Sequence, residues 1–263
     1  MNSEIEKKFS DIAYQKFISG SYKEAIEMCE KSIEADSKSS YPLFLSGCCE
    51  YALKNYSSGI SFISKALELE KESKYYCERA KCKYEIKEYK SAIDDLNYAI
   101  ILERNLRYNY YWMGWCKYGI KDYKGAINEL DTGINLENDV KDDTSKAFLF
   151  WLRAECKYEL EEYESAIDDC DKSIENNSNN SYFFLLRAEC KYELKKYEEA
   201  LSDIEHSINL NPNNYEPFYL RSFIKGDLGN IEGEIEDLDK VISLNPSDFQ
   251  FFKWRGMLKM ILN

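Results

Sequence analysis

Cysteine is the residue of this chain whose type and spacing could do the most chemistry. The stretch RAECKYEL occurs at Arg153–Leu160 and again at Arg187–Leu194, with Cys156 and Cys190 inside it. A cysteine repeated in this way could serve as a metal ligand or as a nucleophile. It could equally be a small apolar residue that packs inside a repeated structure. The arrangement of the rest of the chain decides between these two interpretations.

The spacing of the cysteines argues against a shared chemical site. Five of them take equivalent positions in successive related stretches: Cys49, Cys82, Cys116, Cys156 and Cys190. Neighbouring helices pack about 8–10 Å apart, too far for thiols one repeat apart to share a zinc ion with bonds of about 2.3 Å. There is no CxxC motif, His206 is the only histidine, and no glycine-rich phosphate loop is present. We therefore predict buried free thiols, no catalytic residues, no metal and no cofactor.

Charge and composition narrow the class of partner. The 263-residue chain has a net charge of −13, which argues against nucleic acid as a ligand. Residues 147–248 hold 10 Lys/Arg and 23 Asp/Glu, so a basic partner would be attracted there. No apolar run is long enough for a membrane span, and the charged N-terminus does not resemble a secretory signal. With nine cysteines, this composition predicts a cytoplasmic protein.

The elements that must position these residues repeat along the chain. Stretches related to RAECKYEL predict units that start near residues 6, 40, 73, 107, 147, 181 and 215, with a six-residue insertion at 141–146. Each unit is expected to hold two helices, the second of which begins at a tyrosine in the first six units. Residues 249–263 are expected to form a C-terminal capping helix. Small residues recur at the eighth place of every unit, where helices must approach closely: Ala13, Gly47, Ala80, Gly114, Ala154, Ala188 and Ser222.

This pattern of a small residue, a turn aromatic, an alanine and a terminal proline resembles the tetratricopeptide repeat family. Six units match the pattern, and the seventh departs from it with Ile231 and Glu234 at the tyrosine and alanine places. The resemblance implies an all-α, right-handed α-solenoid of about seven helix-turn-helix repeats plus the capping helix. It also implies a protein that mediates contacts between proteins rather than catalysis. The residues with which some members bind chaperone C-termini are absent, since Ser10, Tyr14 and Leu45 stand at the matching places.

In this family the first helices line a concave groove, and their second, fifth, ninth and twelfth places face it. Trp115 stands at a ninth place where other units have Cys48, Lys81 or Glu155, so packing does not demand it. The recurring tyrosines of the twelfth place could serve the groove or could pack between units, and the sequence leaves both open. Aromatic residues are enriched at binding hot spots. The predicted peptide-binding residues are Tyr84, Tyr108, Tyr111, Trp115, Tyr118, Trp151, Glu155, Tyr158, Glu189 and Tyr192.

Two functions fit these features. The first is a non-catalytic interaction module that binds a peptide or extended segment, carrying Lys or Arg, in an aromatic and partly acidic groove. The alternative is a dedicated chaperone that masks an apolar segment of one client protein. The apolar residues of FQFFKWRGMLKMILN, residues 249–263, would spread around most of a helix. We therefore also predict self-association or partner docking through this segment.

A second recurring pattern predicts an ion pair inside the repeat. Four units have arginine at the seventh place and aspartate sixteen residues later, and the first two units lack both. Such co-occurrence indicates contact between the two helices of one unit. We expect a separation near 3 Å in Arg79/Asp95, Arg153/Asp169, Arg187/Asp203 and Arg221/Asp237.

Overall fold

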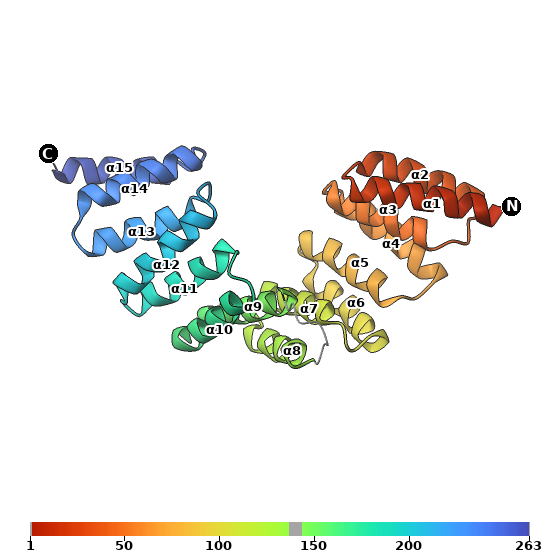
Figure 1. Cartoon of the computed structure of the whole chain (residues 1–263), viewed down its shortest axis with the longest axis horizontal. Helices are drawn as coiled ribbons and strands as arrows, with labels where there is room; N and C mark the ends of the chain where they lie inside the picture. The colour runs from red at the N-terminus through yellow and green to blue at the C-terminus, as the bar shows by residue number, and fades with distance from the viewer. Residues whose placement is uncertain (1, 137–143, 263) are drawn as a thin grey trace. The chain divides into compact units, whose positions relative to one another are not determined.

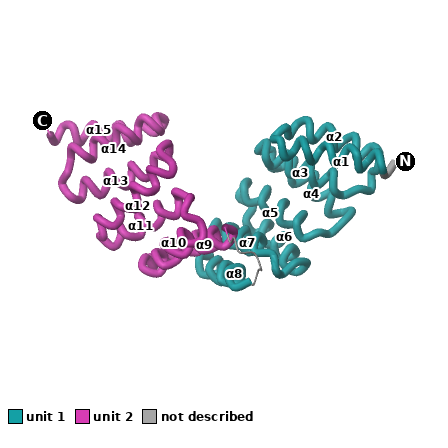
Figure 2. The backbone as a smooth tube through the Cα atoms, viewed as in Figure 1, with its two compact units in different colours: residues 1–136 teal, residues 137–263 magenta. Residues whose placement is uncertain are grey.

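The computed structural model describes residues 2–136 and 144–262, and in these ranges the chain forms helices and no strands (Figure 1). The helices fall into two compact units, residues 1–136 and 137–263 (Figure 2). The predicted all-α helical-repeat solenoid is thereby confirmed. No helix of the described ranges is both long and apolar enough to cross a membrane.

Unit 1 contains four consecutive pairs of helices. The first helices of the pairs are α1 (Asn2–Ile18), α3 (Tyr41–Ala52), α5 (Ser73–Glu85) and α7 (Arg107–Gly119). The second helices are α2 (Tyr22–Ala35), α4 (Tyr56–Leu69), α6 (Tyr89–Leu102) and α8 (Tyr123–Asn135). Each second helix begins at a tyrosine, as the sequence predicts.

Unit 2 contains three pairs and one further helix. Its first helices are α9 (Thr144–Glu159), α11 (Ser181–Glu193) and α13 (Glu216–Asp227), and its second helices are α10 (Tyr163–Asn176), α12 (Tyr197–Leu210) and α14 (Ile231–Leu244). Helix α15 (Phe249–Leu262) packs against α14. Of the predicted insertion, residues 141–143 lie outside the described residues, whereas 144–146 form the first turn of α9. Those three residues therefore extend a helix rather than a linker.

The first helices lie on the inner side of each unit. In unit 1, α1 contacts α3, α3 contacts α5 and α5 contacts α7; in unit 2, α9 contacts α11 and α11 contacts α13. Over the described residues, no two successive second helices of a unit approach each other in this way. A stack in which only one helix of each pair contacts its counterparts must curve toward that helix. The first helices therefore provide the concave face of each unit, as the sequence predicts.

A left-handed turn joins the two helices of every pair. The turn residues have positive φ angles between 58° and 78°: Gly20, Lys54, Lys87, Lys121, Glu161, Lys195 and Gly229. The following amide closes the helix end, as where Asn55 N donates to Glu50 O at 2.8 Å and Glu88 N to Lys83 O at 2.9 Å. Glycine enters this conformation with the least strain, yet only the first and last turns use it.

The predicted ion pairs are confirmed in all four units that carry the pattern. Nitrogen–oxygen distances are 2.5 Å for Arg79–Asp95, 2.5 Å for Arg187–Asp203 and 2.6 Å for Arg221–Asp237, and Arg153 contacts Asp169 in the same way. A lysine four residues after each arginine contacts the same carboxylate, at 2.7 to 2.9 Å: Lys83, Lys157, Lys191 and Lys225. The aspartates are buried. Each carboxylate thus links the second helix of its pair to two cations of the first.

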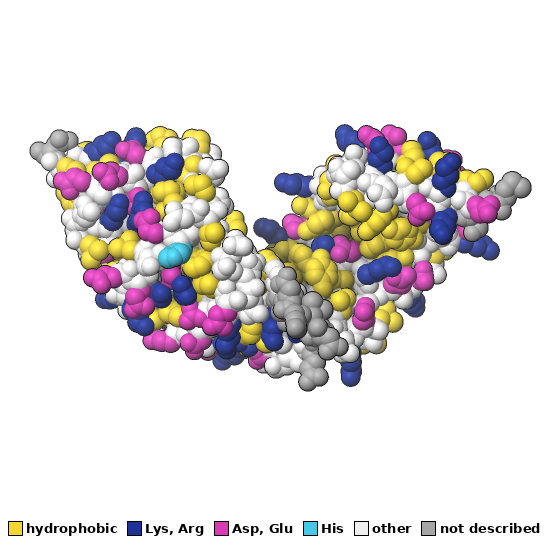
Figure 3. Space-filling view, in the orientation of Figure 1, with side chains coloured by type: hydrophobic (Ala, Val, Ile, Leu, Met, Phe, Trp, Pro, Cys, Tyr) yellow, Lys and Arg dark blue, Asp and Glu magenta, His cyan; other side chains and the backbone are white. Residues whose placement is uncertain are grey.

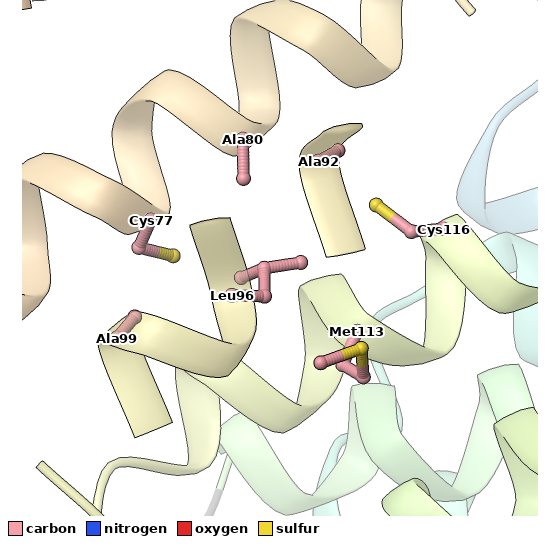
Figure 4. Close-up of a cluster of buried hydrophobic side chains, with 7 residues drawn as sticks. All are labelled: Cys77, Ala80, Ala92, Leu96, Ala99, Met113 and Cys116. Atoms are coloured by element: carbon pink, nitrogen blue, oxygen red, sulfur yellow. The ribbon is translucent and has the colours of Figure 1, made fainter. Parts of the chain in front are cut away.

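The cysteines belong to the packing between helices. Figure 4 shows Cys77 of α5 and Cys116 of α7 among Ala80, Leu96 and Met113 in one buried cluster. The five cysteines of the repeated position are fully buried, and all nine are free thiols. Burial raises the pKa of Cys82, Cys116 and Cys156 to about 12, which suppresses the reactive thiolate. The recurring cysteine is therefore a small apolar residue of the core.

Candidate functional site

The ten predicted site residues all lie on first helices, but they are divided between the units. Unit 1 holds Tyr84 on α5 and Tyr108, Tyr111, Trp115 and Tyr118 on α7. Unit 2 holds Trp151, Glu155 and Tyr158 on α9, with Glu189 and Tyr192 on α11. They form two surfaces of different chemistry.

The unit 1 surface is a cluster of aromatic rings. Tyr84 lies 5.7 Å from Trp112 and 6.1 Å from Trp115, measured between ring centroids. Trp115 in turn lies 6.3 Å from Tyr111 and 5.7 Å from Tyr118. Figure 3 shows hydrophobic side chains gathered over α5 and its neighbours in unit 1. Trp112, at the sixth place of its unit, belongs to this cluster although the sequence analysis did not select it.

The tyrosines of the twelfth place have a structural role. Each ring packs against the tyrosine that begins the next helix, with centroid distances of 5.4 Å for Tyr84–Tyr89, 5.5 Å for Tyr158–Tyr163 and 5.9 Å for Tyr192–Tyr197. Tyr158 also donates a hydrogen bond through its hydroxyl to Glu193 at 3.4 Å. The same ring pair recurs at the turns of both units, so this tyrosine row braces the turns.

The side chain of Lys81 lies among aromatic rings of the unit 1 surface. Its ammonium lies 4.8 Å from the centroid of Tyr51, 5.6 Å from that of Tyr108 and 5.5 Å from that of Trp112. It also contacts the Glu78 carboxylate at 2.7 Å. Burial lowers the pKa of Lys81, but the Glu78 carboxylate and Tyr108 together raise it above its ordinary value. Three rings and one carboxylate thus hold a charged lysine.

Unit 2 has a cavity of about 810 Å³ on its inner face. Its charged lining residues are all acidic: Glu189, Glu193, Glu216 and Asp248. The aromatic lining residues are Tyr158, Tyr192, Tyr215, Tyr219, Phe223, Phe251 and Trp254. The predicted residues Tyr158, Glu189 and Tyr192 all line this cavity. Trp151 does not: its ring centroid lies 6.2 Å from that of Phe183, and its side chain packs against the buried cluster around Ala154 and Cys190. Glu155 interacts electrostatically with Glu216 and Glu189.

The sequence analysis missed the part of this cavity that α13 and α15 provide. Glu216, Tyr219 and Phe223 stand at the second, fifth and ninth places of the seventh unit, which are the groove places of the other units. Their place in the repeat was the signal that could have identified them. Trp254 comes from α15, which packs on α14 and extends the inner face.

The carboxylates of this surface raise one another's proton affinity. Burial, followed by the charges of Glu159 and Glu216, raises the pKa of Glu155 to about 7. Burial, followed by Glu155, Glu216 and Glu193, raises the pKa of Glu189 to about 8. Across the described residues, neither Glu155 nor Glu189 forms an ion pair with a lysine or arginine. Carboxyl groups are thus gathered here without a compensating cation.

A second surface of unit 2 is the outer side of α15. Phe251 and Leu258 are buried against the preceding helices, whereas Phe249, Met260 and Ile261 are each about two-thirds or more exposed, at 69%, 73% and 67%. Arg255 contacts Asp239 of α14 at 2.5 Å. The predicted uneven burial of this helix is therefore present, with a large apolar outer face.

In the described part of the chain, no group of three His, Cys, Asp or Glu side chains is placed to hold one metal ion. His206 lies outside the acidic cavity, on α12, with its ring 5.4 Å from that of Phe184. The candidate site consists of aromatic rings and carboxyl groups.

Comparisons with known proteins agree with this architecture. A family model described as anaphase-promoting complex, cyclosome, subunit 3 matches residues 19–99 and 136–207, and one described as tetratricopeptide repeat matches residues 215–248. No curated protein matches the chain.

Similar solved structures have low sequence identity and show the fold alone. A chain of the APC/C hetero-tetramer Cut9–Hcn1 is 15% identical with a TM-score of 0.74, over 84% of this chain and 43% of that one. This chain thus spans less than half of that protein's length. A tetratricopeptide repeat protein from Parabacteroides merdae is 16% identical with a TM-score of 0.73, over 99% and 100%. YrrB, described as having an unusual peptide-binding site, is 20% identical with a TM-score of 0.54, over 74% and 97%. With matching family models over more than half of its residues and this helical architecture, the chain belongs to the tetratricopeptide repeat family.

Proposed function

We propose that this chain is a non-catalytic interaction module that binds a peptide or extended protein segment along the inner face of unit 2. The observation that carries the proposal is the cavity of about 810 Å³ between α11, α13 and α15. Its walls combine rings that can anchor apolar side chains with carboxylates that attract a basic segment. The likeness to YrrB and to a subunit of an APC/C assembly supports a role in binding proteins.

A cytoplasmic setting is part of the same proposal. Nine free thiols, of which eight are buried, are compatible with a reducing compartment. The proposed partner is a protein or peptide, not nucleic acid, because the net charge of −13 repels phosphate groups.

The test is to locate where a peptide binds. A fluorescein-labelled peptide of lysine, leucine and glycine that carries one benzoylphenylalanine is mixed with the intact protein and irradiated, and cross-linked residues are identified by mass spectrometry. We expect cross-links to Tyr192, Tyr219 and Trp254, which line the cavity. Cross-links that fall on α10, α12 and α14 instead, or an absence of specific cross-links, would contradict the proposal.

The chaperone alternative draws its support from the unit 1 surface. There the rings of Tyr84, Trp112 and Trp115 lie together, and the nearby cation Lys81 is already paired with Glu78. Such a surface would suit an apolar segment. A leucine-rich peptide without charge that cross-links to α5 and α7 in preference to unit 2 would favour this alternative.

Self-association through residues 249–263 remains a separate proposal. It is supported by the exposed apolar face of α15, because exposed apolar patches of this kind mark interfaces. The proposed occupant is a second copy of the chain, in which the excess of acidic residues in 147–248 would attract Lys253. Sedimentation equilibrium of the intact chain against a Met260→Glu, Ile261→Glu variant tests it. Equal masses for both would refute it.

A further inference from the structure

The two units have residues of opposite charge at one equivalent place of a first helix. Lys81 stands at the ninth place of its first helix, and Glu189 stands at the ninth place of the first helix α11. The twelfth place of the preceding first helix is tyrosine in both, Tyr51 and Tyr158. In unit 1, the first helix that follows has Tyr108 and Trp112 at its second and sixth places, near Lys81. In unit 2, the first helix that follows has Glu216 and Leu220 at the same two places.

In unit 1 this position is filled by the chain's own cation. The Lys81 ammonium lies 4.8 Å from the Tyr51 centroid and pairs with Glu78 at 2.7 Å. It shows that the groove between three successive first helices accommodates an ammonium group against tyrosine.

In unit 2 the equivalent position is open. Tyr158, Glu189, Glu216 and Leu220 all line the cavity of about 810 Å³. The tyrosine wall is retained, the lysine is replaced by a carboxylate, and a second carboxylate is added from α13. Over the described residues, no lysine or arginine lines this cavity.

The cations of the same helices are held elsewhere. Arg187 and Lys191 of α11 contact Asp203, while Arg221 and Lys225 of α13 contact Asp237. The charged groups that act on Glu189 are acidic: Glu155 of α9, Glu193 of α11 and Glu216 of α13. Glu159 of α9 acts in the same way on Glu155, and Asp248, before α15, lines the same cavity. An incoming cation would relieve this repulsion.

We propose that the unit 2 cavity binds a lysine side chain of the partner, with its ammonium between Glu189 and Glu216 and beside the ring of Tyr158. The inference rests on the proposed function, since it specifies which group of the bound segment enters the cavity. The partner's lysine takes in unit 2 the place that Lys81 takes in unit 1. The aromatic lining then packs against the methylene groups of the lysine stem.

Binding should release protons. Burial and the neighbouring carboxylates raise the pKa of Glu155 to about 7 and that of Glu189 to about 8, so in the free protein these carboxyls are partly protonated near neutral pH. A bound ammonium favours their ionised forms, and lysine stays charged throughout this range. The affinity for a lysine peptide should therefore rise as the pH increases from about 6 to about 8.

The test compares matched peptides by fluorescence anisotropy with the intact protein. One peptide contains a single lysine among leucine and glycine, the second has norleucine in its place and the third has arginine. We expect norleucine to weaken binding by about tenfold or more. Equal binding of the lysine and norleucine peptides overturns the lysine pocket but leaves the interaction module intact. Failure of all three peptides to bind overturns both proposals, and tighter binding of the arginine peptide overturns the assignment to lysine.

A variant that copies unit 1 gives the sharpest control. Glu189→Lys places the chain's own ammonium beside Tyr158, as Lys81 lies beside Tyr51. We expect it to fold, and to weaken binding of the lysine peptide by about tenfold or more while leaving the norleucine peptide within about twofold. The control is Glu198→Lys, the same substitution on the exposed first turn of α12. Equal losses in the two variants would show that only net charge matters and would overturn the proposal.

Discussion

In each Arg–Asp ion pair between the helices of a repeat, the buried aspartate should contribute far more stability than an exposed aspartate that contacts the same arginine. Arg187 offers both in one molecule. It contacts Asp203 of α12, whose side chain is 4% exposed, and Asp171 of α10, whose side chain is 46% exposed. We predict that Asp203→Ala lowers the free energy of unfolding by about 3 kcal/mol, whereas Asp171→Ala lowers it by less than about 1 kcal/mol.

The magnitude follows from the contacts of Asp203. It accepts hydrogen bonds from Arg187 Nε at 2.9 Å, from Arg187 Nη2 at 2.5 Å and from Lys191 Nζ at 2.9 Å. Hydrogen bonds to charged groups contribute about 1.5–3 kcal/mol each. The sum over these three bonds would exceed the loss of about 3–5 kcal/mol that is typical when one partner of a buried ion pair is removed. Two contacts limit the loss: Arg187 retains Asp171, and Lys191 retains Glu199 at 3.6 Å.

The assay is equilibrium unfolding in urea, followed by circular dichroism at 222 nm and by tryptophan fluorescence. Two probes are needed because repeat proteins can unfold in steps. The double change Arg187→Met, Asp203→Leu should recover part of the lost stability, since it removes the guanidinium together with the carboxylate, and Lys191 retains Glu199. A loss of less than about 1 kcal/mol for Asp203→Ala, or an equal loss for Asp171→Ala, would refute the argument from burial.

Three further predictions concern the turns, the acidic groove and the thiols. Lys87→Gly should raise the free energy of unfolding by about 1 kcal/mol, because Lys87 has a φ of 63°. Lys90→Gly, in the first turn of α6 where φ is negative, should give no such gain in the same urea titration. Since the pKa values of Glu155 and Glu189 are raised to about 7 and about 8, the unfolded chain loses these protons first, so stability should fall as pH rises from about 4.5 to about 8. A Glu155→Gln, Glu189→Gln variant that keeps the whole pH slope in thermal melts would contradict this. All nine thiols should react with Ellman's reagent after denaturation without reductant, and Cys48 first in the native protein; a smaller total would reveal a disulfide.

The sequence determined the features that depend on contacts within one helix pair. Helix starts at Tyr22, Tyr56 and Tyr89 and the Arg–Asp pairs could all be predicted. The two helices of a pair are joined by a short turn, so residues sixteen apart meet in a fixed geometry. A periodic sequence therefore records these contacts directly.

Only the tertiary structure decided the features that require three successive first helices. The sequence selected Tyr108, but the structure shows its ring 5.6 Å from the Lys81 ammonium. It selected Glu189, but the cavity also needs Glu216 and Trp254, from a unit that breaks the motif and from the helix beyond it. Depth of burial, and hence the raised pKa of Glu189, depends on how closely α9, α11 and α13 pack. That closeness is set by side chains from all three helices together, and no single stretch of the sequence records it.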